Sequence, residues 1–182
     1  MSRVAILLGE DFEDSEFDTP LTTLLQNDHE VTVVGPEAGA ELHGKKGRVT
    51  YTADAGIGDV DPGDFDAVVI PGGYSPDKLR TDQRFVDFVK AQIDADHPVA
   101  AICHAGSLLI EADAVRGRTV TSWPSIRTDL LNAGAQWVDE EVVEDGPLIT
   151  SRKPDDLSAF SKAILARIGS PAEVIEARHS AR

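Results

Sequence analysis

Short apolar runs alternate with segments of helical periodicity, and this alternation constrains the fold more than any other feature of the sequence. The apolar runs occupy residues 3–8, 30–34, 66–70 and 98–103. Continuous apolar runs of this length are typical of strands buried on both faces of a sheet. Between them, leucines at 21, 24 and 25 and apolar residues at 85, 88, 89 and 93 recur at helical spacing. The alternation predicts an α/β fold with a mostly parallel sheet and helices on both faces.

The rest of the chain extends this pattern without a second domain. We expect a helix that Ser15 caps, a loop over residues 35–47, a short strand over 49–52 and a helix over about 82–95. Strands at 119–122 and 136–138, a hairpin around Gly146 and a helix over 151–168 follow. Because a length of 182 residues is typical of one domain with a single hydrophobic core, residues 1–169 are predicted to form one domain. Residues 170–182 are then a tail, either a short helix or loose.

The charge and the single cysteine exclude several classes of function. Thirty-two acidic residues face seventeen basic ones, for a net charge of -15, so neither nucleic acid nor an anionic membrane is an expected partner. The first expected strand begins at residue 3, so no signal peptide is expected. The sequence has no run of the ~20 apolar residues that a membrane-spanning helix needs. One cysteine forms no internal disulfide, which fits the cytoplasm. Twenty Asp against twelve Glu, and eleven Arg against six Lys, suggest a halophilic protein whose acidic surface works in high salt.

That cysteine, Cys103, ends the fourth apolar run, and a helical pattern over residues 107–112 follows almost at once. A strand that stops at a nucleophile and turns directly into a helix resembles the nucleophile elbow of α/β hydrolases. The helix N-terminus would favour the thiolate, the form of cysteine that attacks. The alternative interpretation is an inert cysteine buried at the end of a core strand.

Three strand ends carry complementary chemistry, and a parallel sheet brings them to one edge. The acids of Glu10–Asp14 follow the first strand, Gly72 and Gly73 follow the third, and Cys103 with His104 ends the fourth. The N–H groups of the two glycines and of His104 could hold an oxyanion, and an acid of the first loop could share a proton with the thiol. The alternatives are a solvated acidic loop and a plain Pro-Gly-Gly turn. Because His104 directly follows Cys103 in the sequence, its position does not by itself align the imidazole as a base for the thiol.

Three motifs carry a resemblance to a known family: residues 12–16 (FEDSE), 71–77 (PGGYSPD) and 101–105 (AICHA). Residues 122–126, 132–139 and 149–152 continue it. In these segments the chain resembles the DJ-1/PfpI superfamily, in particular its PfpI-like branch of intracellular-protease-like and deglycase-like proteins. The resemblance covers residues 3–168 and implies a flavodoxin-like three-layer sandwich with a nucleophile elbow. The sequence does not fit the glutamine amidotransferases of related fold, because no His-x-Glu motif follows Cys103.

The resemblance also implies roles for individual residues. Cys103 would be the nucleophile, and Glu13 would be the acid hydrogen-bonded to its sulfur. His104 would be the base, oriented by Asp77 of the partner subunit in a homodimer or hexamer. The backbone of Gly73 and His104 would form the oxyanion hole. The chain departs from the family pattern at Ala105, where glycine is common and a positive φ would strain alanine, and at Asp77, where glutamate is common.

The function expected from these residues is that of a cysteine hydrolase without a cofactor. The leading hypothesis is repair of methylglyoxal or glycation adducts in a stress response, by a deglycase or glyoxalase-like reaction on small carbonyl or protein substrates. An intracellular cysteine peptidase is the alternative in the same class. A redox sensor or holdase chaperone is the alternative outside it, since exposed reactive thiols oxidise readily. Neither metal-ligand spacing nor a nucleotide-binding glycine loop occurs in the sequence, so no metal or nucleotide is expected.

Overall fold

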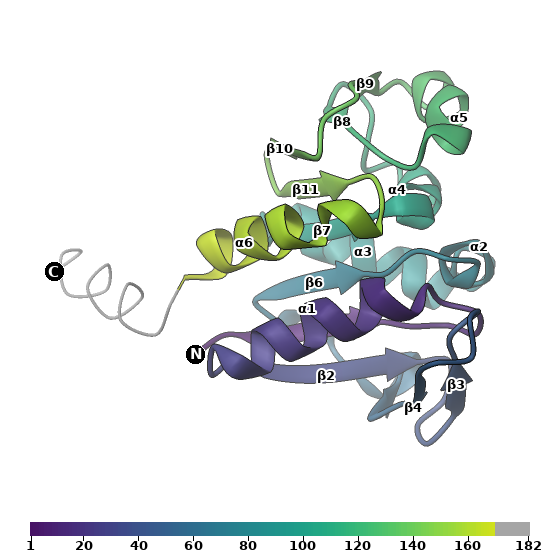
Figure 1. Ribbon diagram of the computed structural model, residues 1–182, viewed down its shortest axis with the longest axis vertical. Helices are drawn as coiled ribbons and strands as arrows, with labels where there is room; N and C mark the ends of the chain where they lie inside the picture. Colours follow the sequence, from purple (N-terminus) through teal and green to yellow (C-terminus); the bar gives the residue numbers. More distant parts are fainter. Residues whose placement is uncertain (170–182) are drawn as a thin grey trace, which may run out of the picture.

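A seven-stranded sheet forms the centre of the molecule in the computed structural model, which describes residues 1–169 (Figure 1). The strand order is β10-β11-β7-β6-β1-β2-β5. The strands are β1 (Arg3–Leu7), β2 (Glu30–Gly35), β5 (Ala55–Gly56), β6 (Ala67–Ile70), β7 (Val99–Ile102), β10 (Val142–Asp145) and β11 (Leu148–Ser151). All neighbouring strands are parallel except β10 and β11, which form the expected hairpin around Gly146.

Helices cover both faces of this sheet, as the sequence predicted. In Figure 1, α1 (Asp14–Gln26) and α6 (Leu157–Ile168) lie in front of the strands, and α3 (Gln83–Asp94) and α4 (Gly106–Glu111) lie behind them. Two apolar clusters fill the spaces between the layers: one packs Phe17 and Phe160 on the front face, the other packs Phe85 and Phe88 on the back. The fold is therefore a three-layer α/β sandwich of flavodoxin-like type.

The register of the parallel strands brings three loops together at one edge. Ile6 of β1 pairs with Val69 of β6, which pairs with Ala100 of β7. The loops that follow these strands consequently open on the same side, as parallel topology requires. A backbone bridge links Phe12 to Gly73, so the first two loops are in direct contact.

Several local expectations differ from the structure. Within the stretch expected to be a loop, the chain forms β3 (Glu41–His43), which pairs in an antiparallel hairpin with β4 (Thr50–Thr52), the short strand expected at residues 49–52. β8 (Thr119–Val120) and β9 (Gln136–Trp137) form their own parallel pair, outside the main sheet. The N-cap of α1 is Glu13 and not Ser15.

The final helix begins later in the sequence than expected. Helix α6 begins at Leu157 and not near residue 151, because Ser151 still pairs with Ile102 in the sheet. The expected tail of 170–182 lies outside the described residues. Within residues 1–169, no helix is both long enough and apolar enough to cross a bilayer.

Candidate active site

The backbone at Cys103 makes a sharp turn between strand and helix. After β7, residues 103–105 form one short turn of 3-10 helix, and α4 begins at Gly106. Cys103 has a φ of 63°, in the left-handed region, which costs a non-glycine residue about 1–2 kcal/mol. Such strain persists where packing enforces it, often at functional sites. The predicted elbow is therefore present, and the strain falls on Cys103; Ala105, with a φ of −60°, is unstrained.

The acids of the first loop are engaged with groups other than the thiol. Glu10 contacts the imidazole Nδ1 of His43 at 3.0 Å. The buried carboxylate of Glu13 accepts from the ammonium groups of Lys45 at 2.9 Å and Lys46 at 2.6 Å. Burial alone would raise the pKa of Glu13, but the hydrogen bonds from the two lysines outweigh it and lower that pKa. The structure thus corrects the expectation for Glu13: its carboxylate binds lysines and is ionised, so it does not hold a proton against the sulfur.

The carboxyl group beside the thiol belongs to Glu16, which lies within α1 and is fully buried. Its Oε2 accepts the N–H of Gly72 at 2.9 Å, its Oε1 has no hydrogen-bond partner among the described residues, and its charge acts on Cys103. A Cβ placed on Gly72 would lie 2.4 Å from Oε2 of Glu16 and 2.7 Å from Cβ of Cys103. The two side chains therefore approach each other across the bare backbone of this glycine.

The thiol and this carboxyl group compete for protons in a buried environment. Burial raises the pKa of Glu16 to about 7, with a further contribution from the negative charge of Glu13. Burial also raises the pKa of the Cys103 thiol, and an ionised Glu16 raises it further. When Glu16 keeps its proton, that repulsion disappears and the neutral carboxyl group can donate to the sulfur. The thiolate therefore forms most easily while Glu16 is protonated.

Backbone N–H groups complete the surroundings of the sulfur. The N–H groups of His104 and Gly73 lie near it and offset part of the rise in the pKa of the thiol. Gly73 has a φ of 78°, and an added Cβ would lie 2.4 Å from the backbone nitrogen of Glu13. Only glycine can bring its backbone so close. Gly72 differs from the expectation, because its N–H donates to Glu16 and so is not turned toward the thiol.

His104 lies at one wall of a cavity of about 390 Å³ that Asp77 of the same chain also lines. Burial and the charge of Lys45 lower the pKa of His104, while Asp77 raises it. The net direction is downward, so the imidazole is neutral at pH 7 and can accept a proton. The expected contact between His104 and Asp77 of the partner subunit stays a prediction.

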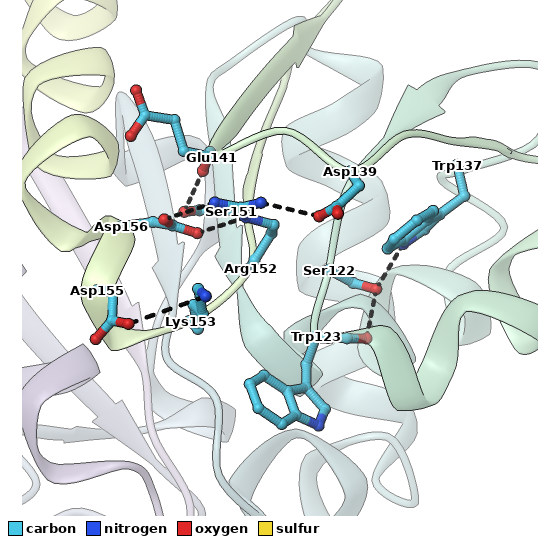
Figure 2. A network of polar contacts seen from close by, with 10 residues as sticks. All are labelled: Ser122, Trp123, Trp137, Asp139, Glu141, Ser151, Arg152, Lys153, Asp155 and Asp156. Atoms are coloured by element: carbon cyan, nitrogen blue, oxygen red, sulfur yellow. Dashed lines mark hydrogen bonds and ion pairs between the residues drawn. The ribbon is translucent and has the colours of Figure 1, made fainter.

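A polar network holds the loop that faces His104 (Figure 2). The indole N–H of Trp137 donates to Ser122 Oγ at 3.0 Å, and this hydroxyl donates to the carbonyl of Trp123 at 2.8 Å. The N–H of Trp123 in turn donates to the Cys103 carbonyl, and its ring lies 6.5 Å from that of His104. The elbow is thereby tied to the β8–β9 segment.

The same figure shows Arg152, just after β11, between Asp139 and Asp156. Its guanidinium donates to Asp139 at 2.8 Å and to both oxygens of Asp156 at 2.8 and 3.0 Å. These bonds connect the end of the sheet to the start of α6 and to the segment after β9. Arg152 therefore has a supporting position and lies outside the thiol's immediate surroundings.

Sequence reasoning missed Lys45, which supplies a cation to the site. Its ammonium group hydrogen-bonds to Glu13, lies 5.8 Å from the centre of the Tyr74 ring, and interacts electrostatically with Cys103 and Glu16. Asp14 holds the segment that carries it, by accepting N–H groups of Lys46, Arg48 and Val49 at 2.8–3.0 Å. The one available signal was the adjacent pair Lys45-Lys46 in a chain with six lysines.

The assembled groups suit nucleophilic addition to a carbonyl. They comprise one thiol, a carboxyl group that titrates near neutrality, a neutral imidazole, two N–H donors and a nearby ammonium group. A protonated Glu16 favours ionisation of the sulfur, and the N–H groups can stabilise a negative oxygen formed beside it. Within residues 1–169, no three His, Cys, Asp or Glu side chains are grouped to hold a metal ion.

Comparison with known proteins identifies the family of the chain. Residues 2–167 match the DJ-1/PfpI family. The chain is 46% identical over 168 residues to protein/nucleic acid deglycase 2 of Escherichia coli, covering 92% of this chain and 98% of the relative. It is 44% identical over 163 residues to YraA of Bacillus subtilis, named as a candidate cysteine protease, covering 90% and 96%. The crystal structure of Drosophila melanogaster DJ-1beta superimposes with a TM-score of 0.87 at 30% identity, covering 97% and 95% of the two chains. The chain belongs to the DJ-1/PfpI family.

Proposed function

We propose that the protein is a cysteine-dependent hydrolase that repairs methylglyoxal or glycation adducts. The observation that carries the proposal is the strained Cys103, buried against the Glu16 carboxyl group with two N–H groups directed at its sulfur. This arrangement supports attack on a carbonyl carbon without a cofactor. The similarity to a deglycase over nearly the whole chain favours adducts as substrates.

The proposed reaction begins when the Cys103 thiolate adds to the aldehyde carbon of methylglyoxal. The carbonyl oxygen takes the electron pair and is stabilised by the N–H groups of Gly73 and His104. The neutral imidazole of His104 then moves the proton from that carbon to the neighbouring ketone carbon through an enediol. This oxidises the first carbon to a thioester and reduces the second to an alcohol. Water cleaves the thioester to lactate and restores the thiol. On a hemiaminal adduct, a bond from the sulfur to that carbon replaces the carbon–nitrogen bond, and the amine leaves with the proton that the thiol gave up. The resulting hemithioacetal then follows the same steps.

The test is release of lactate and free amine from methylglyoxal adducts of N-acetylated amino acids. Wild-type protein is expected to turn these over, and Cys103→Ser is expected to be inactive, because a serine hydroxyl is far less ionised than a thiol. His104→Ala is expected to bind but to process adducts slowly, since the proton carrier is missing. Turnover that survives in Cys103→Ser would refute the proposal.

A cysteine peptidase is the second candidate, and the similarity to YraA favours it. The same thiolate would attack a peptide carbonyl, and His104 would protonate the leaving amine. Cleavage of fluorogenic peptides by wild type and not by Cys103→Ala would support this activity. Adduct turnover without any peptide cleavage would exclude it in favour of repair.

We also propose a homo-oligomer whose interface includes the site. The proposal is supported by the exposed aromatic side chains of Tyr74 and Trp123, 65% and 40% exposed, beside His104. Asp77 of the partner subunit would then contact His104. Sedimentation at micromolar concentration tests it, and a monomer that is fully active would contradict it.

A further inference from the structure

The carboxylate of Asp14 accepts three backbone N–H groups of the hairpin loop, residues 44–49 between β3 and β4. Asp14 is the first residue of α1 and is only 3% exposed. Its Oδ1 accepts the N–H groups of Arg48 at 2.8 Å and Val49 at 2.9 Å, and its Oδ2 accepts that of Lys46 at 3.0 Å. Burial alone would raise the pKa of Asp14, but these hydrogen bonds outweigh it and lower that pKa. The loop is therefore folded around an ionised carboxylate.

Gly44 shows how closely the hairpin loop packs on this carboxylate. A Cβ placed on Gly44 would lie 2.4 Å from Cγ of Asp14, so a side chain there would displace the carboxylate or the loop. The N–H of Gly44 donates to the carbonyl of Val49, and the N–H of Lys45 donates to the carbonyl of Phe12, both at 2.8 Å. The backbone at Lys45 is thus held from both directions, by the segment before α1 and by Asp14 through the next residue.

The hairpin loop carries the ammonium group that acts on the titratable residues of the site. The positive charge of Lys45 attracts the thiolate of Cys103 and the ionised form of Glu16, which is the other charged group beside the thiol. Burial lowers the pKa of His104, Lys45 lowers it further, and Asp77 raises it. Because the interaction between charges weakens with their separation, a displaced loop would change the titration of all these groups.

We propose that Asp14 is a positioning residue, whose carboxylate holds the hairpin loop so that Lys45 stays within electrostatic reach of Cys103 and His104. Its action is indirect, because its hydrogen bonds to other residues all go to the loop. An aspartate in the first turn also stabilises a helix through the helix dipole, but that role alone would leave the titration of the site unchanged. The inference rests on the proposed function for its bearing on turnover, yet the effect on the thiol can be measured without a substrate.

The first experiment measures the rate at which iodoacetamide alkylates Cys103 as a function of pH. In Asp14→Asn the side-chain amide has one oxygen for two of the loop N–H groups, and its NH₂ group faces the N–H of Lys46, so the anchor next to Lys45 is lost. We expect the profile to move upward by about half a pKa unit, which slows alkylation at pH 7 about threefold. Lys45→Met should slow it at least as much. The imidazole of His104, followed by NMR, should titrate at higher pH in both variants.

Combining the two substitutions separates positioning from a structural role. If Asp14 acts through Lys45, Asp14→Asn has no further effect on alkylation in the Lys45→Met background. Asp66→Asn is the matched control: its carboxylate accepts the N–H of Arg3 at 2.8 Å, just before β6 and at the opposite edge of the sheet, so the pH profile should stay that of wild type. Gly44→Ala displaces the loop by a second route and should reproduce the effect of Asp14→Asn, including when Asp14→Asn fails to fold.

A wild-type pH profile in folded Asp14→Asn or Gly44→Ala would overturn the proposal, as would a loss of rate that persists in the Lys45→Met background. The second experiment measures lactate release from methylglyoxal by wild type and the same variants. Unchanged alkylation together with normal lactate release refutes the positioning role and leaves the repair function standing. Slowed alkylation in the variants of a protein that releases no lactate refutes the repair function and leaves the positioning role standing.

Discussion

The raised pKa of Glu16 makes a quantitative prediction about stability, which the variant Glu16→Gln tests. The folded-state pKa is about 7 against an ordinary 4.5, so the folded chain resists ionisation of this carboxyl group. Below pH 4.5 the group is protonated in both states and costs nothing. As pH rises through 4.5 and on through 7, the unfolded chain releases the proton first, and the folded state loses stability. At about 1.4 kcal/mol per pKa unit, the full cost is about 3 kcal/mol above pH 8.

Glutamine keeps the shape of the side chain and can still accept the N–H of Gly72, but it has no charge to bury. Relative to wild type, Glu16→Gln should therefore gain about 2 kcal/mol between pH 5.5 and pH 8.5, a range that avoids precipitation near the pI of about 4.6. That gain corresponds to a Tm difference of about 4–8 °C for a domain of this size. Urea unfolding at each pH measures it, provided that the slopes agree.

Glu13→Gln is the matched control, because Glu13 lies just before the same helix but its pKa is lowered. Its carboxylate contributes stability above pH 4.5 that is lost only as pH falls through its depressed pKa. Glu13→Gln should thus be destabilised equally at pH 5.5 and 8.5. A stability difference between Glu16→Gln and wild type that is constant over this range would refute the reasoning. Repeating the series with Cys103→Ser separates the carboxyl group from the thiol.

Three further predictions concern the backbone, the cation and the surface. Gly73→Ala should cost about 3 kcal/mol or more in urea unfolding, because its Cβ would lie 2.4 Å from backbone at a positive φ. Gly39→Ala, with the same φ and open space around it, should cost only about 1 kcal/mol, and equal costs would contradict the packing argument. Lys45→Met should slow alkylation of Cys103 at neutral pH and move its pH profile upward more than Lys46→Met does; identical profiles would remove Lys45 from the site. The net charge of -15 predicts that Tm rises from dilute buffer to molar KCl, and a flat series would contradict the high-salt hypothesis.

Much of the scaffold could be predicted from local patterns. The apolar run over 98–103 and the helical spacing that follows it predicted both β7 and the elbow at Cys103. Hydrophobic periodicity and the residue preferences of turns extend over only a few residues, so both can be recognised in a linear sequence. The strand β3 was not predicted, because three residues carry too few positions to show a period.

The carboxyl group that lies beside the thiol could not be identified from local sequence patterns. Glu10, Glu13, Asp14 and Glu16 are close in sequence and chemically alike. What distinguishes them is the segment that packs against each one. The hairpin loop brings two lysines to Glu13 from 32 and 33 residues away, and the backbone of Gly72 meets Glu16 from 56 residues away. Contacts at such separations leave no local pattern.

The sequence by itself determined the layered sheet, the edge where its loops meet, and a single cysteine at a strand-to-helix turn. It did so because strand burial and turn geometry follow from the order of neighbouring side chains. Only the tertiary structure decided which carboxyl group is neutral enough to face the sulfur, which cation balances it, and which carboxylate holds the loop that carries this cation. Those properties depend on burial and on the distance between charges, and both exist only once the chain has packed.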